Sequence, residues 1–452
     1  MDNNFRSLML VSLIGTSLLG CGSDSDDSTD TSGYFQYYNA SANSTLTAVL
    51  IDDYTYGTVD FADAIPRYSY TTGTMEFSLY GLDEDGTSFE LYTQDVTLDG
   101  ENEHLLVLYG DFHSPEVLDV SFSRTEMDEL NSDEDNEYSK MQVLVANAAV
   151  EQSFDAYIAL ETQAIEEAVL LGTVDYGSYT TEQIFDTEDY VVYLTDVGTK
   201  DVVYTTGSMS LSANTVYKLV MRPSFGAGEL GFTIDNVDST TTPTNYTALE
   251  SEAEINVFNG LENQTIDVEI VSEDESQYVH DLTSFAVSPF ESIGYNDFAV
   301  KAKSAEDGTT LFDNLLMTFN QGEIKTVLVY PTSDTQASGI VIEQDLRPRP
   351  YEFRVDITNL TYFYDDLNVY FVRDNETVEN AEYTLTDVDF EEQLSIDLPI
   401  EDYRISVVSE SDNGTQTLVY QSDSISVEGE GNYSFVLIPD AMSPFEHSLI
   451  KL

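Results

Sequence analysis

The feature that most constrains this chain is a strand-rich unit that the sequence repeats four times. Each repeat opens with an apolar strand that ends in an asparagine, and these asparagines are Asn39, Asn147, Asn259 and Asn359. Further along, an alternating strand runs into a tight turn whose glycines are Gly86, Gly198, Gly308 and Gly414, spaced 112, 110 and 106 residues apart. Asp-Gly and Asn-Gly turns favour two-residue hairpins, although Val197 fits that role poorly in the second repeat. The 452-residue chain is therefore expected to contain four similar units of about 100 residues each.

The pattern within each repeat predicts an all-β fold. Each unit contains roughly seven short segments of alternating polarity, and helical periodicity is almost absent. Such segments, separated by turns, predict four tandem immunoglobulin-like antiparallel β-sandwich domains. A domain of this size can bury enough apolar surface to fold without a disulfide. Aromatic residues for the cores are plentiful, with 30 Tyr and 23 Phe.

A five-residue motif recurs in three of the units and raises the question of a repeated catalytic site. It reads GTVDF at Gly57–Phe61, GTVDY at Gly172–Tyr176 and TDVDF at Thr386–Phe390. Side chains alternate along a strand, so Val59 and Val174 are expected on one face and Asp60 and Asp175 on the other. We interpret the motif as a strand of the repeated domain and not as a catalytic site. In the third unit, its place is expected at Ser284–Phe290, where the motif is lost.

The N-terminus contains an apolar stretch that leads to the single cysteine of the chain. The apolar stretch Leu8–Leu19 is too short to span a bilayer but has the length of a signal-peptide core. It leads into Leu-Leu-Gly-Cys ending at Cys21, which resembles the lipobox of bacterial lipoproteins. The resemblance implies removal of the signal before Cys21 and addition of lipid to its sulfur. By the same resemblance, Gly22 in place of an aspartate after the cysteine implies the outer membrane and not retention at the inner one. The alternative is a short buried helix with a buried free thiol.

These signals and the repeat pattern set the expected domain boundaries. Residues 1–20 are the predicted signal peptide, and 21–33 are the lipidated cysteine and a Ser/Asp-rich flexible tether. The four β-sandwiches are predicted at 34–124, 141–238, 253–346 and 351–452. Between them lie an acidic linker at 125–140, a polar linker at 239–252 and a Pro-rich linker at 347–350. The acidic linker is expected to be flexible or to form a short helix, and the Pro-rich linker to be short and stiff.

The charge of the chain excludes several classes of partner. It has 84 acidic and 16 basic residues, a formal net charge of −68. Nucleic acids and anionic lipid surfaces would be repelled by this charge. The only membrane contact we expect is therefore through the lipid anchor. The acidity is expected to serve solubility in salty water.

No sequence motif for catalysis survives inspection. The stretch GAGELG at Gly226–Gly231 matches a dinucleotide-binding pattern, but a strand follows it where a helix is required, so we interpret it as a hairpin tip. The four histidines, at 104, 113, 280 and 447, lack metal-ligand spacing and are expected to be packed or exposed to solvent. Paired carboxylates suited to glycoside hydrolysis stay possible, because so many acids form pairs by chance.

Calcium is the one cofactor that the sequence leaves open. Asp83 and Asp85 lie in a turn of the first unit, and Asp133 and Asp135 lie in the first linker. Calcium requires six to eight oxygen ligands, which acidic clusters supply. Neither cluster fits the EF-hand spacing, and the alternative interpretation is that both are solvated acidic turns. No other cofactor is expected.

The strands that open the repeats end in a recurring tripeptide, Asn39-Ala40-Ser41 in the first unit and, in altered form, Asn147-Ala148-Ala149 in the second. In this they resemble a bacterial envelope family, DUF4397, whose units open with a hydrophobic strand that ends in Asn-Ala-Ser and whose domain has no assigned function. In the later units Gly260 and Leu360 follow the asparagine instead. The resemblance implies a β-sandwich fold and a location in the cell envelope. It implies no activity.

Taken together, these features predict a non-enzymatic protein anchored by lipid in the bacterial cell envelope. We expect it to act as an extracytoplasmic binding, adhesion or spacer module whose partners are envelope proteins or polysaccharide. Four such sandwiches arranged in line would extend well clear of the membrane. The alternative is an envelope carbohydrate-active hydrolase that uses a carboxylate pair, which requires a cleft lined by acids of raised pKa.

Overall fold

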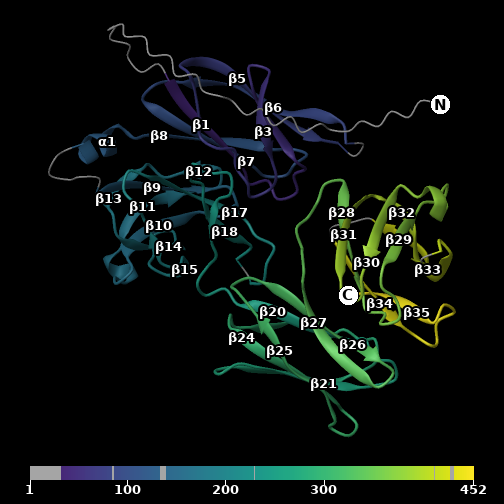
Figure 1. The fold of residues 1–452 in the computed structure, drawn as a ribbon. Coiled ribbons are helices and arrows are strands. Elements are labelled where there is room, and N and C mark those ends of the chain that lie inside the picture. Colours follow the sequence, from purple (N-terminus) through teal and green to yellow (C-terminus); the bar gives the residue numbers. More distant parts are fainter. Residues whose placement is uncertain (1–31, 84–85, 133–138, 229, 412, 428–431) are drawn as a thin grey trace, which may run out of the picture.

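The computed structural model describes residues 32–83, 86–132, 139–228, 230–411, 413–427 and 432–452. Cys21 and the predicted signal peptide lie outside these residues. Most of the described chain is β-strand, and the predicted all-β sandwich fold is confirmed (Figure 1). The helix α1 (Thr125–Ser132) occupies the first linker, and two short 3-10 helices are η1 (Ile165–Glu167) and η2 (Val378–Asn380). None of the described helices is long and apolar enough to cross a membrane.

The first unit consists of two four-stranded sheets. Their orders are β4-β1-β7-β8 and β3-β2-β5-β6. The strands are β1 (Ser32–Asn39), β2 (Thr47–Ile51), β3 (Tyr54–Val59), β4 (Tyr68–Thr71), β5 (Gly73–Leu82), β6 (Ser88–Leu98), β7 (Asn102–Tyr109) and β8 (Glu116–Ser123). Its core includes Phe35, Tyr37, Val49 and Phe77, all fully or almost fully buried.

The second unit has the same two layers with shorter, more divided edge strands. One sheet runs β12-β9-β17-β18-β19 with β13 also beside β9, and the other runs β11-β10-β14-β15 with β16 also beside β14. The strands are β9 (Lys140–Asn147), β10 (Phe154–Leu160), β11 (Val169–Val174), β12 (Ser178–Tyr179), β13 (Gln183–Asp186), β14 (Asp189–Asp196), β15 (Val202–Thr205), β16 (Met209–Ser210), β17 (Val216–Pro223), β18 (Phe232–Asn236) and β19 (Thr244–Tyr246).

The third and fourth units return to the plan of the first. The third has sheets β23-β20-β26-β27 and β22-β21-β24-β25, and the fourth has β31-β28-β34-β35 and β30-β29-β32-β33. The strands are β20 (Ala253–Asn259), β21 (Ile266–Val271), β22 (Ser276–Leu282), β23 (Glu291–Ile293), β24 (Asp297–Ser304), β25 (Thr310–Thr318), β26 (Ile324–Ser333), β27 (Gln336–Glu343), β28 (Glu352–Asn359), β29 (Leu367–Val372), β30 (Tyr383–Val388), β31 (Gln393–Pro399), β32 (Glu401–Glu410), β33 (Gln416–Val427), β34 (Tyr433–Pro439) and β35 (His447–Lys451).

The strand pairing differs from the expected antiparallel pattern at one place in every unit. The opening strand runs parallel to the penultimate long strand, as in β1 with β7, β9 with β17, β20 with β26 and β28 with β34. Parallel neighbours require a long crossover connection, and the second sheet of each sandwich supplies it. Each unit also has an edge strand, such as β4 in the first, that the sequence pattern did not separate from its neighbours.

These parallel strands are apolar on both faces because they lie between two layers. In β7, Leu106 and Leu108 pack into the core of unit 1, whereas Leu105 and Val107 belong to an apolar cluster shared with unit 2. In β26 of unit 3, alternate residues divide in the same way between its own core and a cluster shared with unit 4. Units 1 and 2 therefore form one face-to-face pair, and units 3 and 4 form another.

The repeated asparagine is buried in every unit, and in units 3 and 4 it fastens the opening strand to the motif strand of the other sheet. In unit 4, Asn359 is buried; its Oδ1 accepts a hydrogen bond from the Thr361 N–H at 3.0 Å, and its Nδ2 donates to the carbonyls of Tyr364 and Val388, both at 3.1 Å. Asn259 makes the equivalent bonds in unit 3, with Leu282 in the place of Val388. In units 1 and 2 the Nδ2 of the buried asparagine donates instead to the loop that follows the opening strand, at Ser44, Val150 and Gln152, so the buried amide is paired in every repeat.

The recurring motif is part of the architecture, as its alternation predicted. Val59, Val174 and Val388 are buried at the ends of their strands, and Asp60 and Asp175 are exposed immediately after them. The placement at Ser284–Phe290 in unit 3 was wrong. The equivalent strand is β22, and that segment contributes only one isolated bridge, Phe258 with Val287. The signal was lost because Leu282 replaces the motif valine.

The predicted hairpins are present, but their loops are longer than the expected two residues, because the closing backbone hydrogen bonds join Asp83 to Thr87, Ser304 to Thr309 and Ser411 to Thr415. Gly86, Gly198, Gly308 and Gly414 have φ angles of 70°, 75°, 73° and 80°. Only open space surrounds the position of an added Cβ at each of them, so the left-handed backbone alone explains the glycine.

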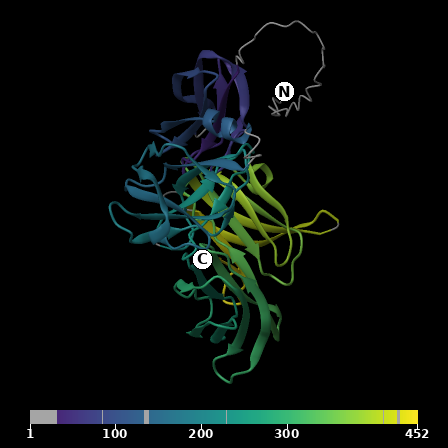
Figure 2. The same cartoon turned by 90° about the vertical axis from the view of Figure 1, so that its left-hand side faces the viewer.

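The four units are not arranged in line. In Figure 1 they surround a common centre, with unit 1 at the top, unit 2 on the left, unit 3 at the bottom and unit 4 on the right. The view in Figure 2 shows unit 1 and unit 3 at opposite ends of the molecule. The connection from unit 3 to unit 4 reaches back to unit 1, where Arg347 donates a hydrogen bond to the Ala42 carbonyl.

Candidate functional site

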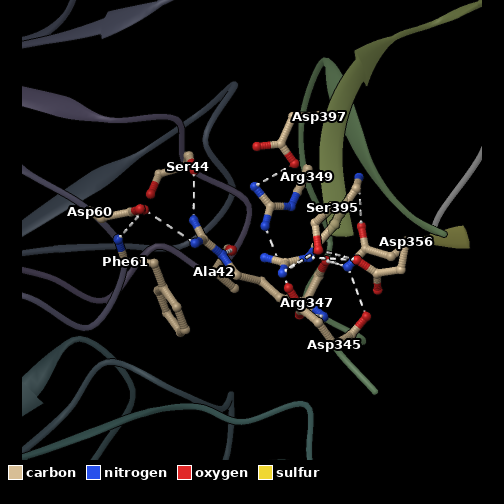
Figure 3. Close-up of polar contacts among 12 residues, drawn as sticks. Ala42, Ser44, Asp60, Phe61, Asp345, Arg347, Arg349, Asp356, Ser395 and Asp397 are labelled. Atoms are coloured by element: carbon tan, nitrogen blue, oxygen red, sulfur yellow. Dashed lines mark hydrogen bonds and ion pairs between the residues drawn. The ribbon is translucent and has the colours of Figure 1, made fainter. Parts of the chain in front are cut away.

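The candidate site is the junction where the connection between units 3 and 4 lies against unit 1. The connection comprises residues 344–351, between β27 and β28. Arg347 is the central residue of the site (Figure 3). Its Nε and Nη2 donate to the carbonyls of Ala42 and Ser44, both at 2.8 Å, and its Nη1 lies 3.1 Å from Asp60 Oδ1. All three guanidinium nitrogens thus bind unit 1, in the forked geometry that makes arginine suited to such contacts.

The aromatic residue of the first motif lies at the same place. Arg347 and Arg222 are positioned over the Phe61 ring, at 4.8 Å and 5.2 Å from its centroid. The ring of Phe225, from the loop between β17 and β18, lies 6.4 Å from that of Phe61. Cation–π contacts of this kind contribute about 0.5–1 kcal/mol at exposed sites and more when water is excluded. Asp60 and Phe61 of the motif therefore join unit 1 to unit 2 and to the connection.

Aromatic residues of the motif make contacts between units in the other copies as well. Tyr176 of unit 2 packs edge-to-face on Tyr109 of unit 1 at 5.2 Å, and Phe390 of unit 4 packs in the same way on Tyr330 of unit 3 at 5.8 Å. The Tyr330 hydroxyl also donates to Glu391 at 2.6 Å. The motif thus combines a core valine with an aromatic residue at an interface.

Two further arginines, Arg349 of the connection and Arg354 of β28, bind carboxylates of the connection and of unit 4. Arg349 pairs with Asp345 at 3.4 Å and with Asp397 at 3.5 Å. Arg354 donates from Nε to Asp356 at 3.0 Å and from Nη2 to Ser395 at 2.8 Å. These arginines are compensated by acids, so the junction is held by paired charges.

The glycine-rich hairpin tip of unit 2 completes the junction from the side of unit 3. Strands β17 and β18 flank this segment, so the prediction of a hairpin tip is confirmed, and a strand follows where a dinucleotide site would need a helix. The Ala227 N–H donates to the Gly322 carbonyl at 2.8 Å. A Cβ on Gly226 would lie 2.1 Å from that carbonyl oxygen, so only glycine allows the two units to approach this closely.

A polar network centred on a buried carboxylate crosses the interface of units 1 and 2. Asp235 is 2% exposed and accepts from the Tyr38 hydroxyl at 2.6 Å, from Arg222 Nε at 2.7 Å and from Asn245 Nδ2 at 2.7 Å. Burial, followed by the charge of Asp235, raises the pKa of Tyr38 well above its ordinary value. The hydroxyl therefore stays protonated and serves as a fixed donor.

Two pockets flank the connection. The larger, of about 780 Å³, lies between units 1, 2, 3 and 4 and is lined mainly by polar side chains with Phe61 and Phe225. The smaller, of about 220 Å³, lies between units 1 and 4 and contains Glu352 and Asp397. Burial, and then the charge of Asp397, raises the pKa of Glu352. This pair is the observation that best fits the hydrolase alternative, although Arg349 already binds Asp397.

The predicted metal ligands are not brought together in the described part of the chain. Asp85, Asp133 and Asp135 lie outside the described residues, as does Cys21. Asp83 accepts from the Thr87 N–H at 2.7 Å and thereby closes its hairpin turn. Across the described ranges, no group of three or more His, Cys, Asp or Glu side chains is placed to hold a metal ion. The calcium hypothesis stays a prediction.

The histidines do not form a site. His104 is nearly buried with its Nδ1 2.8 Å from Asp119, and His113 and His280 lie beside Asp111 and Asp267. His447 Nδ1 contacts the Phe445 carbonyl at 3.0 Å.

Sequence reasoning missed the arginines of the junction. Three of the 16 basic residues, Arg347, Arg349 and Arg354, fall within RPRPYEFR. Such a concentration of positive charge in a chain of net charge −68 was the available signal. Reading this segment only as a stiff proline linker concealed it.

Comparisons with known proteins add little to these observations. No family model matches the chain, and no curated protein matches it. Among solved structures, the chain is similar to the Bacillus anthracis TIE protein, with 7% identity over 91% of this chain and 75% of that one and a TM-score of 0.16. It is also similar to BcpA, the major pilin subunit of Bacillus cereus, with 8% identity over 66% of this chain and 98% of that one and a TM-score of 0.15. At such scores these likenesses carry no argument about function.

Proposed function

We propose that this protein is a non-enzymatic lipoprotein of the bacterial cell envelope that presents a four-domain module for binding, adhesion or spacing. The observation that carries the proposal is the closure of the four sandwiches around the junction by Arg347. A linker that binds back onto the first domain limits the relative motion of the domains. Such an arrangement suits a protein that holds surfaces in fixed positions.

The chemistry of the junction supports a binding role over catalysis. Its arginines are paired with carboxylates, which leaves the cationic groups compensated. The motif residues that recur among the units serve the cores and the interfaces. The second candidate function is a hydrolase that uses Glu352 and Asp397, favoured by the raised pKa of Glu352 in the smaller pocket.

Anchoring is supported by the sequence before the first strand. The lipobox ends at Cys21, and β1 begins at Ser32, so about ten residues separate the predicted lipid from unit 1. We propose that the lipid at Cys21 holds the module at the outer membrane, with envelope proteins or polysaccharide as its partners. Labelling with palmitate and membrane fractionation test this. Wild type should carry label and sediment with membranes, whereas Cys21→Ala should do neither.

The shape of the module tests the closure. We expect Arg347→Ala to increase the radius of gyration measured by small-angle X-ray scattering, because the connection loses its hydrogen bonds to unit 1. The matched control is Arg404→Ala, since Arg404 is an exposed arginine of unit 4. An unchanged radius for Arg347→Ala would show that the closure does not depend on this contact.

The hydrolase alternative is tested separately with envelope polysaccharides. We expect the wild-type protein to release no reducing ends from them. Release that disappears in both Glu352→Gln and Asp397→Asn would establish the second candidate and overturn the non-enzymatic proposal.

A further inference from the structure

We propose that the larger pocket at the junction binds a neutral oligosaccharide. This inference rests on the proposed function of the protein as a binding module and names the class of ligand. For clarity we call this space the junction pocket, defined by Phe61, Arg222, Phe225, Gln321, Arg354 and Gln393 among its lining residues. Its volume of about 780 Å³ falls within the range of about 300–1,000 Å³ that is usual for ligand pockets.

Much of the lining of the junction pocket consists of polar side chains with planar end groups. Arginine, asparagine, glutamine, aspartate and glutamate all contribute from different units, among them Arg222 and Asn245 from unit 2, Gln321 from unit 3 and Gln393 from unit 4. Together these groups present both donors and acceptors. A sugar hydroxyl both donates and accepts, so a saccharide can satisfy such a set, whereas an apolar ligand cannot. The polar character of the pocket thus argues for a polyhydroxylated ligand.

Several of these groups are available to a ligand. The side-chain amides of Gln321 and Gln393 make no hydrogen bond with any part of the chain that the structure describes. Phe225 is half-buried, and its ring contacts that of Phe61. Phe61 itself is occupied by the two arginines over its ring. Phe225 is therefore the aromatic surface on which the apolar face of a sugar ring can pack, while the glutamine amides meet its hydroxyls.

The charges around the pocket favour a neutral ligand. The arginines of the lining are engaged by acids: Arg222 by Asp235, Arg347 by Asp60 and Arg354 by Asp356. The lining also contains Glu323, Glu343 and Asp345, so it holds no excess of positive charge. An anionic ligand would be repelled by these acids and by the net charge of −68. Uronic acids and phosphorylated glycans are therefore expected to bind poorly.

Isothermal titration calorimetry tests this with neutral gluco-, manno- and galacto-oligosaccharides and with matched uronic-acid oligomers. We expect at least one neutral series to bind and the uronic-acid series not to bind. Phe225→Ala and Gln393→Ala should each weaken binding by about tenfold or more, because each removes one ligand contact. The control is Tyr54→Ala, since Tyr54 is an exposed aromatic residue of unit 1 outside the pocket lining and should leave affinity unchanged.

Three outcomes would overturn the inference. These are no binding of any neutral oligosaccharide, equal binding of the uronic-acid series, and binding that both pocket variants leave intact. Circular dichroism and scattering of the variants must match wild type, and Gln393→Glu provides a second variant of similar size that should also lose affinity. None of these outcomes affects lipid anchoring at Cys21 or the closure by Arg347, so failure of this inference is distinguishable from failure of the proposed function.

Discussion

The two pairs of sandwiches place different chemistry at equivalent positions of their interfaces. Arg222 and Ile438 each follow the residue that pairs with the repeated asparagine of their unit. Asp235 and Ile450 occupy the matching positions on the neighbouring strands β18 and β35. The interface of units 1 and 2 thus has a buried ion pair where that of units 3 and 4 has two isoleucines.

The difference follows from where each interface lies. Arg222 contacts Asp235 within its own unit, Phe61 of unit 1 and the junction pocket. Its counterpart Ile438 belongs to an apolar cluster with Leu328 and Tyr330. Apolar burial stabilises without strong directional demands, whereas a hydrogen-bonded ion pair requires one relative orientation of its partners. We infer that units 1 and 2 carry the orientation-sensitive interface because they also receive the connection.

The largest expected effect comes from removing one member of the ion pair. Arg222→Met should lower the free energy of unfolding of units 1 and 2 by about 3–5 kcal/mol, because it leaves the Asp235 carboxylate buried without its cation. Urea denaturation, fitted with more than one transition because the protein has several domains, measures this. Ile438→Met at the matching position of unit 4 should cost less than about 1.5 kcal/mol.

The same comparison predicts how the loss can be repaired. Arg222→Ile with Asp235→Ile copies the pair found in unit 4 and should cost less than Arg222→Met alone, because no unpaired charge remains. The Tyr38 hydroxyl then loses its acceptor, so some cost of about 1–3 kcal/mol is expected. A double variant less stable than the single one would show that the ion pair itself, and not its incompleteness, governs this interface.

A second, pH-dependent effect distinguishes the two interfaces. Lys218 is almost fully buried between units 1 and 2, and its Nζ donates to Gln36 at 2.8 Å. Burial lowers its pKa from 10.5 to about 8, opposed by the charges of Glu103 and Asp238, while Arg67 and Arg124 lower it further. The folded state therefore binds fewer protons than the unfolded state between about pH 8 and 10.5. The free energy of unfolding should rise with pH across this window.

The expected gain from Lys218 is on the order of 3 kcal/mol over that window. Urea denaturation at a series of pH values, with wild type compared with Lys218→Met, isolates it, because tyrosine titration is common to both proteins. The variant should lose the rise. If the free energy of unfolding depended equally on pH in the two proteins, burial would not lower the pKa of Lys218 in the folded state. Ser434 is the equivalent residue of unit 4 and contributes no such titration.

The smallest expected effect concerns one backbone position that differs among the motifs. Gly177 has φ 68°, and its equivalents Ala62, Phe285 and Glu391 have φ 67°, 59° and 68°. A Cβ on Gly177 would lie 2.5 Å from the Tyr109 hydroxyl of unit 1. Gly177→Ala should therefore destabilise units 1 and 2 by about 1–2 kcal/mol, from the left-handed backbone and the displaced tyrosine.

Removing the tyrosine separates these two causes. In the Tyr109→Phe background the hydroxyl is absent, so Gly177→Ala should cost less than in wild type when unfolding is followed by urea denaturation. A cost unchanged by Tyr109→Phe would assign the whole effect to the backbone. Ala62→Gly tests the same backbone geometry in unit 1 and should be neutral or slightly stabilising.

How much of this structure could be predicted depended on whether the determinants were local. The turn glycine at 308 and the buried valine of the motif at 174 follow from neighbouring residues, and both were predicted. The parallel pairing of β1 with β7 was missed, because it depends on which sheet the opening strand joins. Uninterrupted apolar runs such as LLVLY in β7 indicated burial on both faces, which is typical of a strand between two layers.

The candidate site was less accessible to prediction for the same reason. Arg347 binds a carbonyl 305 positions earlier in the chain, and nothing near it in sequence indicates that partner. Asp60 and Phe61 were recognised as repeated residues, but their role depends on units that fold far away in sequence. Cys21 and the acidic positions 85, 133 and 135 stay predictions from the sequence.

The long reach of Arg347 also sets an order of events during synthesis. Units 1 and 2 can pair as soon as β18 has emerged, because their shared cluster involves only residues before 238. The hydrogen bonds from Arg347 to the carbonyls of Ala42 and Ser44 can form only after the connection between units 3 and 4 has been synthesised. Until then the surface of unit 1 that receives Arg347 is exposed to solvent, and a chain that stops before residue 347 lacks the contact that closes the module.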